Sequence, residues 1–175
     1  MGSFYRKQLE DYLATTNVAA DLLYDIGGKQ KSVQGRTKSW NVKKIVCLDV
    51  PEYDLNEPQK LETQADFVFC LEVFEYLIDP LQALKNISAA MKPNATAIVT
   101  FPFVYPIHNE VAFDSLRYTE TGIKRMAEKA GLKVKKVTNR KTINNTLVRY
   151  YKEDGMKMAK DQNHDITGYI FEFTK

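Results

Sequence analysis

The chain of 175 residues lacks the features that mark several classes of protein. No apolar run reaches the roughly 20 residues that a membrane-spanning helix needs. The opening residues MGSFYRKQLEDYL lack the apolar block of a signal peptide. The two cysteines, Cys47 and Cys70, each stand in an apolar, strand-like run, which predicts small core residues in a reducing compartment. We therefore expect a cytoplasmic protein without a disulfide framework.

The two histidines and the scattered acids give no spacing typical of a metal site, so no metal is expected. The proportions of 44% hydrophobic and 27% charged residues are typical of a globular protein, and the length fits one domain over residues 1–175. The net charge of +3 conceals an asymmetry, because residues 124–160 hold twelve Lys and Arg against three acids. That basic segment is either a solvated outer face or a surface that attracts an anionic substrate or RNA.

Apolar runs alternate with helical patterns along the chain. The spacing predicts a helix over residues 4–16 and further helices that begin after the N-caps Asp79 and Thr119. Continuous apolar runs predict buried strands at residues 22–26, 44–48, 67–71, 97–101, 132–137 and 166–173. This alternation predicts an α/β fold, a doubly wound and largely parallel sheet with helices on both faces.

In such a sheet, ligands bind beyond the carboxyl ends of the strands. Gly27 and Gly28 end the first predicted strand, and Asp49 ends the second, 22 positions after Gly27. Leu71 and Glu72 end the third. Glycines permit close approach of a ligand to the backbone, and an acid placed like Asp49 can accept hydrogen bonds from a ribose diol. Two glycines and an acid also occur in ordinary turns, so both interpretations stay open at this point.

A dinucleotide site is one alternative that the sequence disfavours. Such a site needs G-x-G-x-x-G at the start of a helix, where free N–H groups meet the pyrophosphate. Here the letters are GGKQKS, which fail at the second and third glycines. A cofactor without a pyrophosphate does not need that fingerprint.

The run DFVFCLEVFEYLIDPLQALKNISAAMKPNATAIVTFPF resembles the central segment of class I S-adenosylmethionine-dependent methyltransferases. That family typically shows a strand, a Leu-Glu-His-like turn, Asp-Pro, a helix, Lys-Pro-Gly-Gly and a strand. Here the first strand is residues 67–71 and the turn is Phe74-Glu75-Tyr76. The helix starts at Asp79-Pro80, and Lys92-Pro93-Asn94-Ala95 stands for Lys-Pro-Gly-Gly. The later FPFVYPIHN and SLRYTETGIKRMAEKAGLKV are similar to a subgroup found in polysaccharide and surface-sugar gene clusters. The resemblance spans roughly residues 20–138 and implies a Rossmann-like fold with an antiparallel C-terminal edge strand.

The resemblance also implies S-adenosylmethionine as the cofactor and gives a role to each residue at the strand ends. Gly27 and Gly28 would face its methionine part, with Asp25 supporting the loop. Asp49 would hold the ribose hydroxyls. Asp54 and Leu55 would lie near the adenine edge. Leu71 and Glu72 would line the pocket near the sulfonium.

The predicted acceptor is a small molecule such as a sugar, a nucleotide-sugar or a glycan precursor. His108 follows a strand end and is the candidate general base, with a structural loop hydrogen bond as the alternative. Tyr105, Arg117 and Tyr118 are candidates to hold the acceptor. Arg117 would suit a phosphate or carboxylate, unless it organises the start of the next helix.

The chain departs from the family at several points, which leaves two alternatives. Lys29 and Lys31 stand where the family's Asp-x-Gly-x-Gly-x-Gly loop has glycine, and Tyr76 replaces the usual histidine. The links after Gly28 and after Asp49 leave little room for the usual helices. One alternative is a catalytically lapsed domain that binds a partner through the basic segment. The other is a nucleic-acid methyltransferase, although no RNA module is recognisable.

Overall fold

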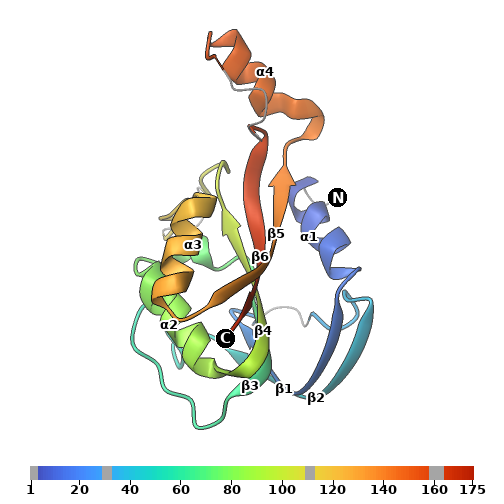
Figure 1. Cartoon of the computed structure of the whole chain (residues 1–175), viewed down its shortest axis with the longest axis vertical. Helices are drawn as coiled ribbons and strands as arrows, with labels where there is room; N and C mark the ends of the chain where they lie inside the picture. Colours follow the sequence, from blue (N-terminus) through green and yellow to red (C-terminus); the bar gives the residue numbers. More distant parts are fainter. Residues whose placement is uncertain (1–3, 29–32, 109–112, 158–163) are drawn as a thin grey trace.

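The computed structural model describes residues 4–28, 33–108, 113–157 and 164–175. Six strands form one sheet in the order β2-β1-β3-β4-β6-β5 (Figure 1). The first four strands are parallel, and they are β1 (Asn17–Ile26), β2 (Ser39–Leu48), β3 (Ala65–Cys70) and β4 (Met91–Pro102). The last strand, β6 (Ile166–Thr174), runs antiparallel to β4 and to β5 (Lys133–Lys141). The predicted α/β fold is confirmed, although β5 and not the C-terminal strand forms the edge.

Helices cover both faces of the sheet, as predicted (Figure 1). α1 (Phe4–Leu13) packs Leu9 and Leu13 into the core of one face. α2 (Pro80–Ala90) and α3 (Glu120–Lys129) pack against the other face. Both predicted caps form, because the side chains of Asp79 and Thr119 accept hydrogen bonds from the backbone of the first turn.

The connections on either side of β2 contain no helix within residues 33–38 and 49–64, the described parts of those links. The structure therefore confirms that these links are short. β2 lies at the edge of the sheet and alternates between exposed and half-buried residues. The prediction that both faces of this strand are covered is wrong, and so is the placement of Cys47 in the core, because Cys47 is exposed. Cys70, on the inner strand β3, is buried as predicted.

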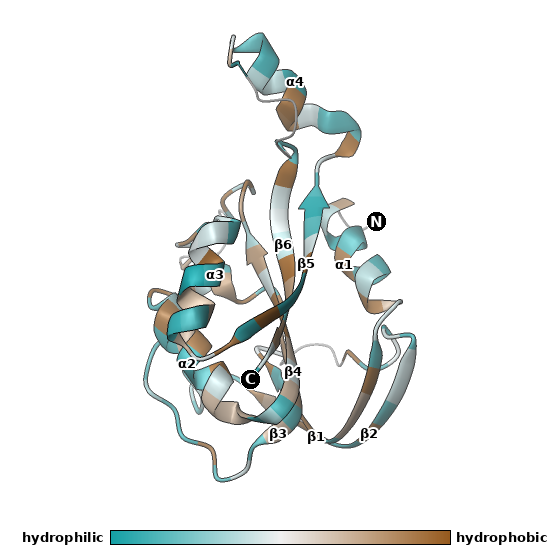
Figure 2. Cartoon of the chain, in the orientation of Figure 1, coloured by the Kyte–Doolittle hydropathy of each residue, from teal (hydrophilic) through white to brown (hydrophobic). Residues whose placement is uncertain are grey.

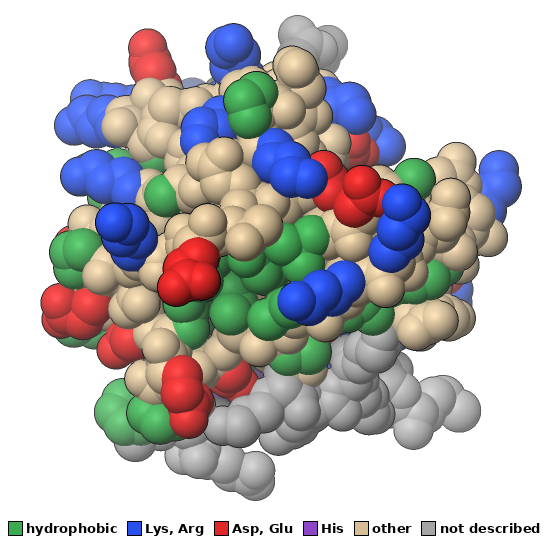
Figure 3. All heavy atoms as spheres, turned by 90° about the horizontal axis from the view of Figure 1, so that it is seen from below, with side chains coloured by type: hydrophobic (Ala, Val, Ile, Leu, Met, Phe, Trp, Pro, Cys, Tyr) green, Lys and Arg blue, Asp and Glu red, His purple; other side chains and the backbone are tan. Residues whose placement is uncertain are grey.

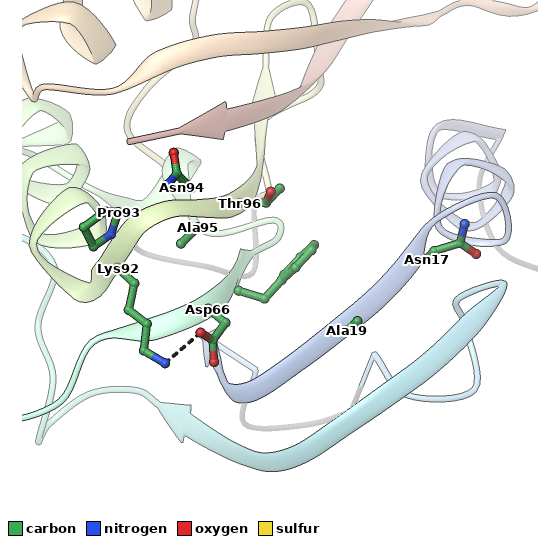
Figure 4. A pocket seen from close by; sticks show the side chains of 9 residues that line it. Asn17, Ala19, Asp66, Lys92, Pro93, Asn94, Ala95 and Thr96 are labelled. Atoms are coloured by element: carbon green, nitrogen blue, oxygen red, sulfur yellow. Dashed lines mark hydrogen bonds and ion pairs between the residues drawn. The ribbon is translucent and has the colours of Figure 1, made fainter.

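The face that carries α1 is hollowed near the amino ends of β1, β3 and β4. Two adjoining pockets of about 400 and 260 Å³ share Asn17, Phe67 and Thr96. Figure 3 views the molecule from below and shows apolar side chains gathered between charged ones. In Figure 4, Lys92 points toward Asp66, and its Nζ lies 2.7 Å from a carboxylate oxygen. This groove lies at the end of the sheet opposite to the predicted site.

The basic segment is partly helical. After η2 (Ile143–Asn145), α4 (Thr146–Glu153) stands away from the sheet and buries none of its residues (Figures 1 and 2). Arg140, by contrast, has no exposed surface. It therefore does not belong to the basic outer face that the charge count predicted.

Candidate functional site

The parallel register brings the carboxyl ends of three strands together. Ile26 pairs with Leu48 on one side and with Cys70 on the other, so the residues that follow each of them are neighbours. Gly27 has a φ of 74°, and a Cβ atom built there would lie 2.4 Å from Cγ2 of Val73. The first loop and the loop after β3 are thus in contact, and glycine is required at this position.

Gly28 lies directly over the carboxyl group of Asp25. A Cβ atom at Gly28 would fall 2.2 to 2.6 Å from the atoms of that carboxyl group. Asp25 is buried, and burial raises the pKa of its carboxyl group to about 6. Gly27 and Gly28 thus form a narrow turn at the end of β1, here called the cradle, in which contacts with Val73 and Asp25 require glycine. Lys29 and Lys31 lie outside the described residues.

Asp49 ends β2 beside this cradle. Its side chain accepts a hydrogen bond of 2.8 Å from the backbone N–H of Val50. Asp54 and Leu55 are placed differently from Asp49. The Asp54 carboxylate accepts from the backbone and the side chain of Asn56, and Leu55 is buried in the core beneath α2. The two residues therefore stabilise the link between β2 and β3, and their predicted place at an adenine edge gains no support from these contacts.

Leu71 and Glu72 follow β3, as predicted, and Leu71 packs against the core on the α1 side. Glu72 has a φ of 58°, which is uncommon for a residue other than glycine. Its backbone N–H donates to the hydroxyl of Thr100 at 2.6 Å. Its carboxylate accepts at 2.6 Å from Nη1 of Arg140, whose guanidinium also lies over the ring of Tyr5. Sequence reasoning missed Arg140 and Tyr5, because only the fold brings β5 and α1 to this point.

His108 forms a pair with Asp114. Its ring nitrogen Nδ1 lies 3.1 Å from Oδ2 of Asp114, and its backbone N–H donates to the same oxygen at 2.7 Å. The side chain of His108 is 32% exposed, whereas that of Asp114 is 1% exposed. Hydrogen bonds from Arg117 hold the pKa of Asp114 far below its usual value, so Asp114 is ionised. Its carboxylate can therefore accept a hydrogen bond from an N–H at Nδ1 of His108. That arrangement leaves Nε2 of His108 as the acceptor.

Arg117 is not available to an acceptor. Its five N–H donors are all used within the chain, on the two carboxylate oxygens of Asp114 and the carbonyls of Tyr105, Pro106 and Leu116. These contacts are those of a residue that organises the loop before α3, the alternative that the sequence left open, and they give no support to its predicted role in binding an anion. A guanidinium whose donors are all used has none left for a phosphate or carboxylate.

The three tyrosines near His108 differ in what they offer. The ring centroids of Tyr105 and Tyr76 lie 5.2 and 5.9 Å from that of His108. Tyr118 is buried, and its hydroxyl donates to the carbonyl of Phe74 at 2.6 Å. Tyr118 is thus a core residue, and these contacts give no support to its predicted role in holding the acceptor. Tyr105 and Tyr76 remain beside the histidine.

Glu75, like Asp114, is an acid that sequence reasoning did not assign to the site. It is 4% exposed, and its Oε2 has no hydrogen-bond partner among the described residues. Its backbone carbonyl accepts from Ser115 and Leu116, which ties it to the loop that carries Asp114. Burial, reinforced by the nearby charge of Glu72, raises the pKa of Glu75 to about 7. Two sequence signals pointed to it, an acid inside the apolar stretch FEYL and its place in the turn Phe74-Glu75-Tyr76 that resembles the family's Leu-Glu-His.

These raised pKa values predict how stability depends on pH. In the unfolded chain Asp25 and Glu75 titrate near 3.8 and 4.5, and in the folded protein near 6 and 7. Folding therefore favours their protonated forms, and the stabilisation that is present at low pH is lost as the pH rises through 6 and 7. We expect the free energy of unfolding, measured with urea, to be lower at pH 7.5 than at pH 5, by on the order of 1 kcal/mol for each group.

The variants Asp25→Asn and Glu75→Gln should each flatten this dependence. Asp66 and Asp114, whose pKa values are lowered by Lys92 and Arg117, act in the opposite direction but only as the pH falls below about 4. A protein equally stable at both pH values, with variants that behave like the parent, would show that neither carboxyl group is buried as described.

Comparison with known proteins identifies the family. The sequence profile of a family described as methyltransferase domain matches residues 8–97, a little over half of the chain. The chain belongs to this family. The methyltransferase uses S-adenosylmethionine as its methyl donor, as the resemblance of the sequence implied. The comparison with curated proteins gave no match.

Solved structures show the same fold at low sequence identity. An S-adenosylmethionine-dependent methyltransferase from Mesorhizobium loti superposes with a TM-score of 0.64 at 9% identity, over 99% of each chain. The N-methyltransferase NodS from Bradyrhizobium japonicum gives 0.57 at 11% identity, over 98% of this chain and 96% of that one. The [4+2]-cyclase SpnF gives 0.55 at 10% identity, over 96% and 80%. At such identities the likeness concerns the fold alone.

The residues of the methyltransferase fit the cofactor that the family implies. At Gly27 and Gly28 a side chain would collide with Val73 and with the carboxyl group of Asp25, so contacts within the protein require glycine at both positions and keep the backbone of this turn free of side chains. Asp49 offers carboxylate oxygens to hydroxyl donors at the next strand end. Within the described residues, no three His, Cys, Asp or Glu side chains gather as a metal site, and no helix is long and apolar enough to cross a membrane.

Proposed function

We propose that the methyltransferase transfers a methyl group to a hydroxyl of a small acceptor without a negative charge, such as a sugar, with His108 as the general base. The pairing of His108 with the buried Asp114 carries this proposal. The acceptor group lies, in this proposal, between Nε2 of His108 and the ends of β1 and β3. Asp25, Gly27, Gly28, Asp49, Leu71 and Glu72 are the proposed cofactor contacts.

Bound S-adenosylmethionine supplies a methyl group on a positively charged sulfur, which leaves as a neutral thioether. The protein's part is to position the acceptor and to take up its proton. Asp114 holds the imidazole of His108 by accepting from Nδ1, so that Nε2 faces outward and can accept that proton. The ionised Asp114 then stabilises the imidazolium, and Arg117 keeps Asp114 in place with two hydrogen bonds.

The surroundings of His108 favour an acceptor without a negative charge. Tyr76 and Tyr105 present aromatic rings on which the apolar face of a sugar ring can pack. Arg117, which shares Asp114 with His108, has no donor left for an anion. A sugar or a glycan precursor is therefore favoured, and a nucleotide-sugar would have to place its phosphates elsewhere.

A binding titration tests the proposal. S-adenosylmethionine and S-adenosylhomocysteine are each titrated into the full chain by isothermal calorimetry, and saturation at micromolar concentration is expected. Absence of binding at millimolar ligand would indicate a catalytically lapsed domain of the same fold. Binding to RNA that weakens steeply with salt would instead favour a nucleic-acid methyltransferase.

Asp49 provides the sharpest check on the cofactor contacts. Replacing Asp49 with alanine is expected to weaken S-adenosylmethionine binding by about 1–3 kcal/mol, because hydrogen bonds from the ribose to a charged acceptor are lost. The matched control is Glu52→Ala, which removes an exposed acid three positions further along. Equal affinity in the Asp49 variant and the control would remove Asp49 from the site.

A further inference from the structure

Three acids and two arginines surround the site end of β3, and one acid has no counter-ion. Glu72 is paired with Arg140, at 2.6 Å. Asp114 is paired with Arg117 through both carboxylate oxygens. Glu75 has no ion pair within the described residues, and its Oε2 has no hydrogen-bond partner there. The cluster therefore contains one more acid than it has cations.

The groups that face Glu75 come from every element around it. Glu72, Cys70 and Tyr76 lie on β3 and the turn after it, and Tyr5 and Arg140 come from α1 and β5. The loop before α3 adds Asp114, Arg117 and Tyr118. Both arginines are already paired with other acids, and although the charge of Arg140 lowers the pKa of Glu75, it offsets burial and the charge of Glu72 only in part.

A buried carboxylate without a counter-charge is costly, and the protein can avoid that cost in two ways. The carboxyl group can hold a proton, which agrees with its raised pKa of about 7. It can also lose the proton when a ligand brings a positive charge beside it.

We propose that Glu75 is the counter-charge for a positively charged group on a bound ligand, either the sulfonium of the methyl donor or an ammonium on the acceptor. This inference rests on the proposed function, because the proposed cofactor contacts end at Glu72, three residues before Glu75. It adds a residue to the site that cofactor and acceptor share, and it makes recognition depend on charge.

The proposal has a measurable consequence in protons. A cation beside Glu75 stabilises the carboxylate, so its arrival releases a proton wherever the free protein is protonated at this group, below about pH 7. Affinity for the charged ligand should therefore rise between pH 5.5 and pH 8 and then level off. Affinity for an uncharged ligand of the same shape should not follow this course.

The test compares S-adenosylmethionine with S-adenosylhomocysteine, which lacks the methyl group and the positive charge. Both are titrated into the full chain at pH 6.5, in two buffers with different ionisation enthalpies, to count released protons. If Glu75 faces the sulfonium, Glu75→Gln should lower the affinity for S-adenosylmethionine by about 10-fold or more and abolish proton release. The affinity for S-adenosylhomocysteine should stay within about twofold. Glu62→Gln, at an exposed acid, is the matched control.

If Glu75 instead faces the acceptor, the ratio of the two affinities should be the same in the variant and the parent. Glucosamine and glucose then serve as a charged and an uncharged probe of the protein loaded with S-adenosylhomocysteine. Glucosamine should bind more tightly than glucose and release a proton, and Glu75→Gln should remove both differences. Glu75→Asp, which keeps the charge, should retain part of them.

The proposal is overturned if Glu75→Gln leaves the affinity ratio unchanged and the parent protein binds glucosamine no better than glucose. A general loss of folding in the variant would show as equal weakening of S-adenosylmethionine and S-adenosylhomocysteine, and that outcome also counts against a charge-specific role. Failure of the proposed function is distinguishable from these results, because the unaltered protein would then bind neither compound.

Discussion

Replacing Glu72 with glutamine is expected to lower the free energy of unfolding by about 3 kcal/mol, because it leaves the charge of Arg140 buried without a partner. The guanidinium side chain is 1% exposed, and Glu72 is the acid that meets it. The other groups that Arg140 contacts, the carbonyl of Tyr5 and the ring of Tyr5, carry no full negative charge. Urea denaturation at pH 7 measures the loss.

Two companion variants separate the buried charge from other effects. In the double variant Glu72→Gln with Arg140→Met, no charge is left buried, so much of the stability should return. Glu120→Gln breaks the exposed pair between Glu120 and Lys124 and should cost less than about 1 kcal/mol. Equal small losses for Glu72→Gln and Glu120→Gln would contradict the burial of the Glu72–Arg140 pair.

Replacing His108 with glutamine is expected to reduce turnover by roughly 10²-fold or more, since the acceptor hydroxyl would lose its proton acceptor. The affinity for S-adenosylmethionine should stay close to that of the parent, because His108 lies on the loop after β4, apart from the cradle of Gly27 and Gly28. Asp114→Asn should reduce turnover in the same direction, because an amide can donate to Nδ1 and so favour the wrong tautomer. Turnover of a methylated product at saturating cofactor is the measurement.

The other histidine provides the control for this prediction. His164→Gln changes a residue outside the pair with Asp114 and should leave turnover within about twofold of the parent. Near-normal turnover in His108→Gln would return that histidine to a structural role, in which its hydrogen bond to Asp114 only orders the loop. A parallel fall in stability and turnover would point to the same structural role.

Local chemistry explains which parts of the fold could be predicted. Asp79 and Thr119 satisfy the free N–H groups of a first helical turn, so both helix starts were predictable from single residues. Asn94 adopts the left-handed conformation expected where the family has glycine, with a φ of 64°. Whether the rest of the protein covers both faces of β2 was not predictable from single residues. Its apolar letters are compatible with a buried strand or an edge strand, and only the order of strands distinguishes them.

The site likewise has features that the sequence predicts and features that it does not. Gly27, Asp49 and Glu72 follow strand ends in the sequence, and parallel strands in register place their ends side by side, so their proximity was predictable. The states of Arg117 and Tyr118 were not, because the letters do not show which donors the chain has already used.

By itself the sequence determined the order of strands and helices, the family, and the residues at the strand ends, because these depend on local patterning and on neighbours in the chain. Only the tertiary structure decided how the charges are matched. Arg140 meets Glu72 from 68 residues away, while Glu75 is left without a cation among the described residues. Whether a buried charge is compensated depends on groups brought together from distant segments, and that information exists only once the chain has folded.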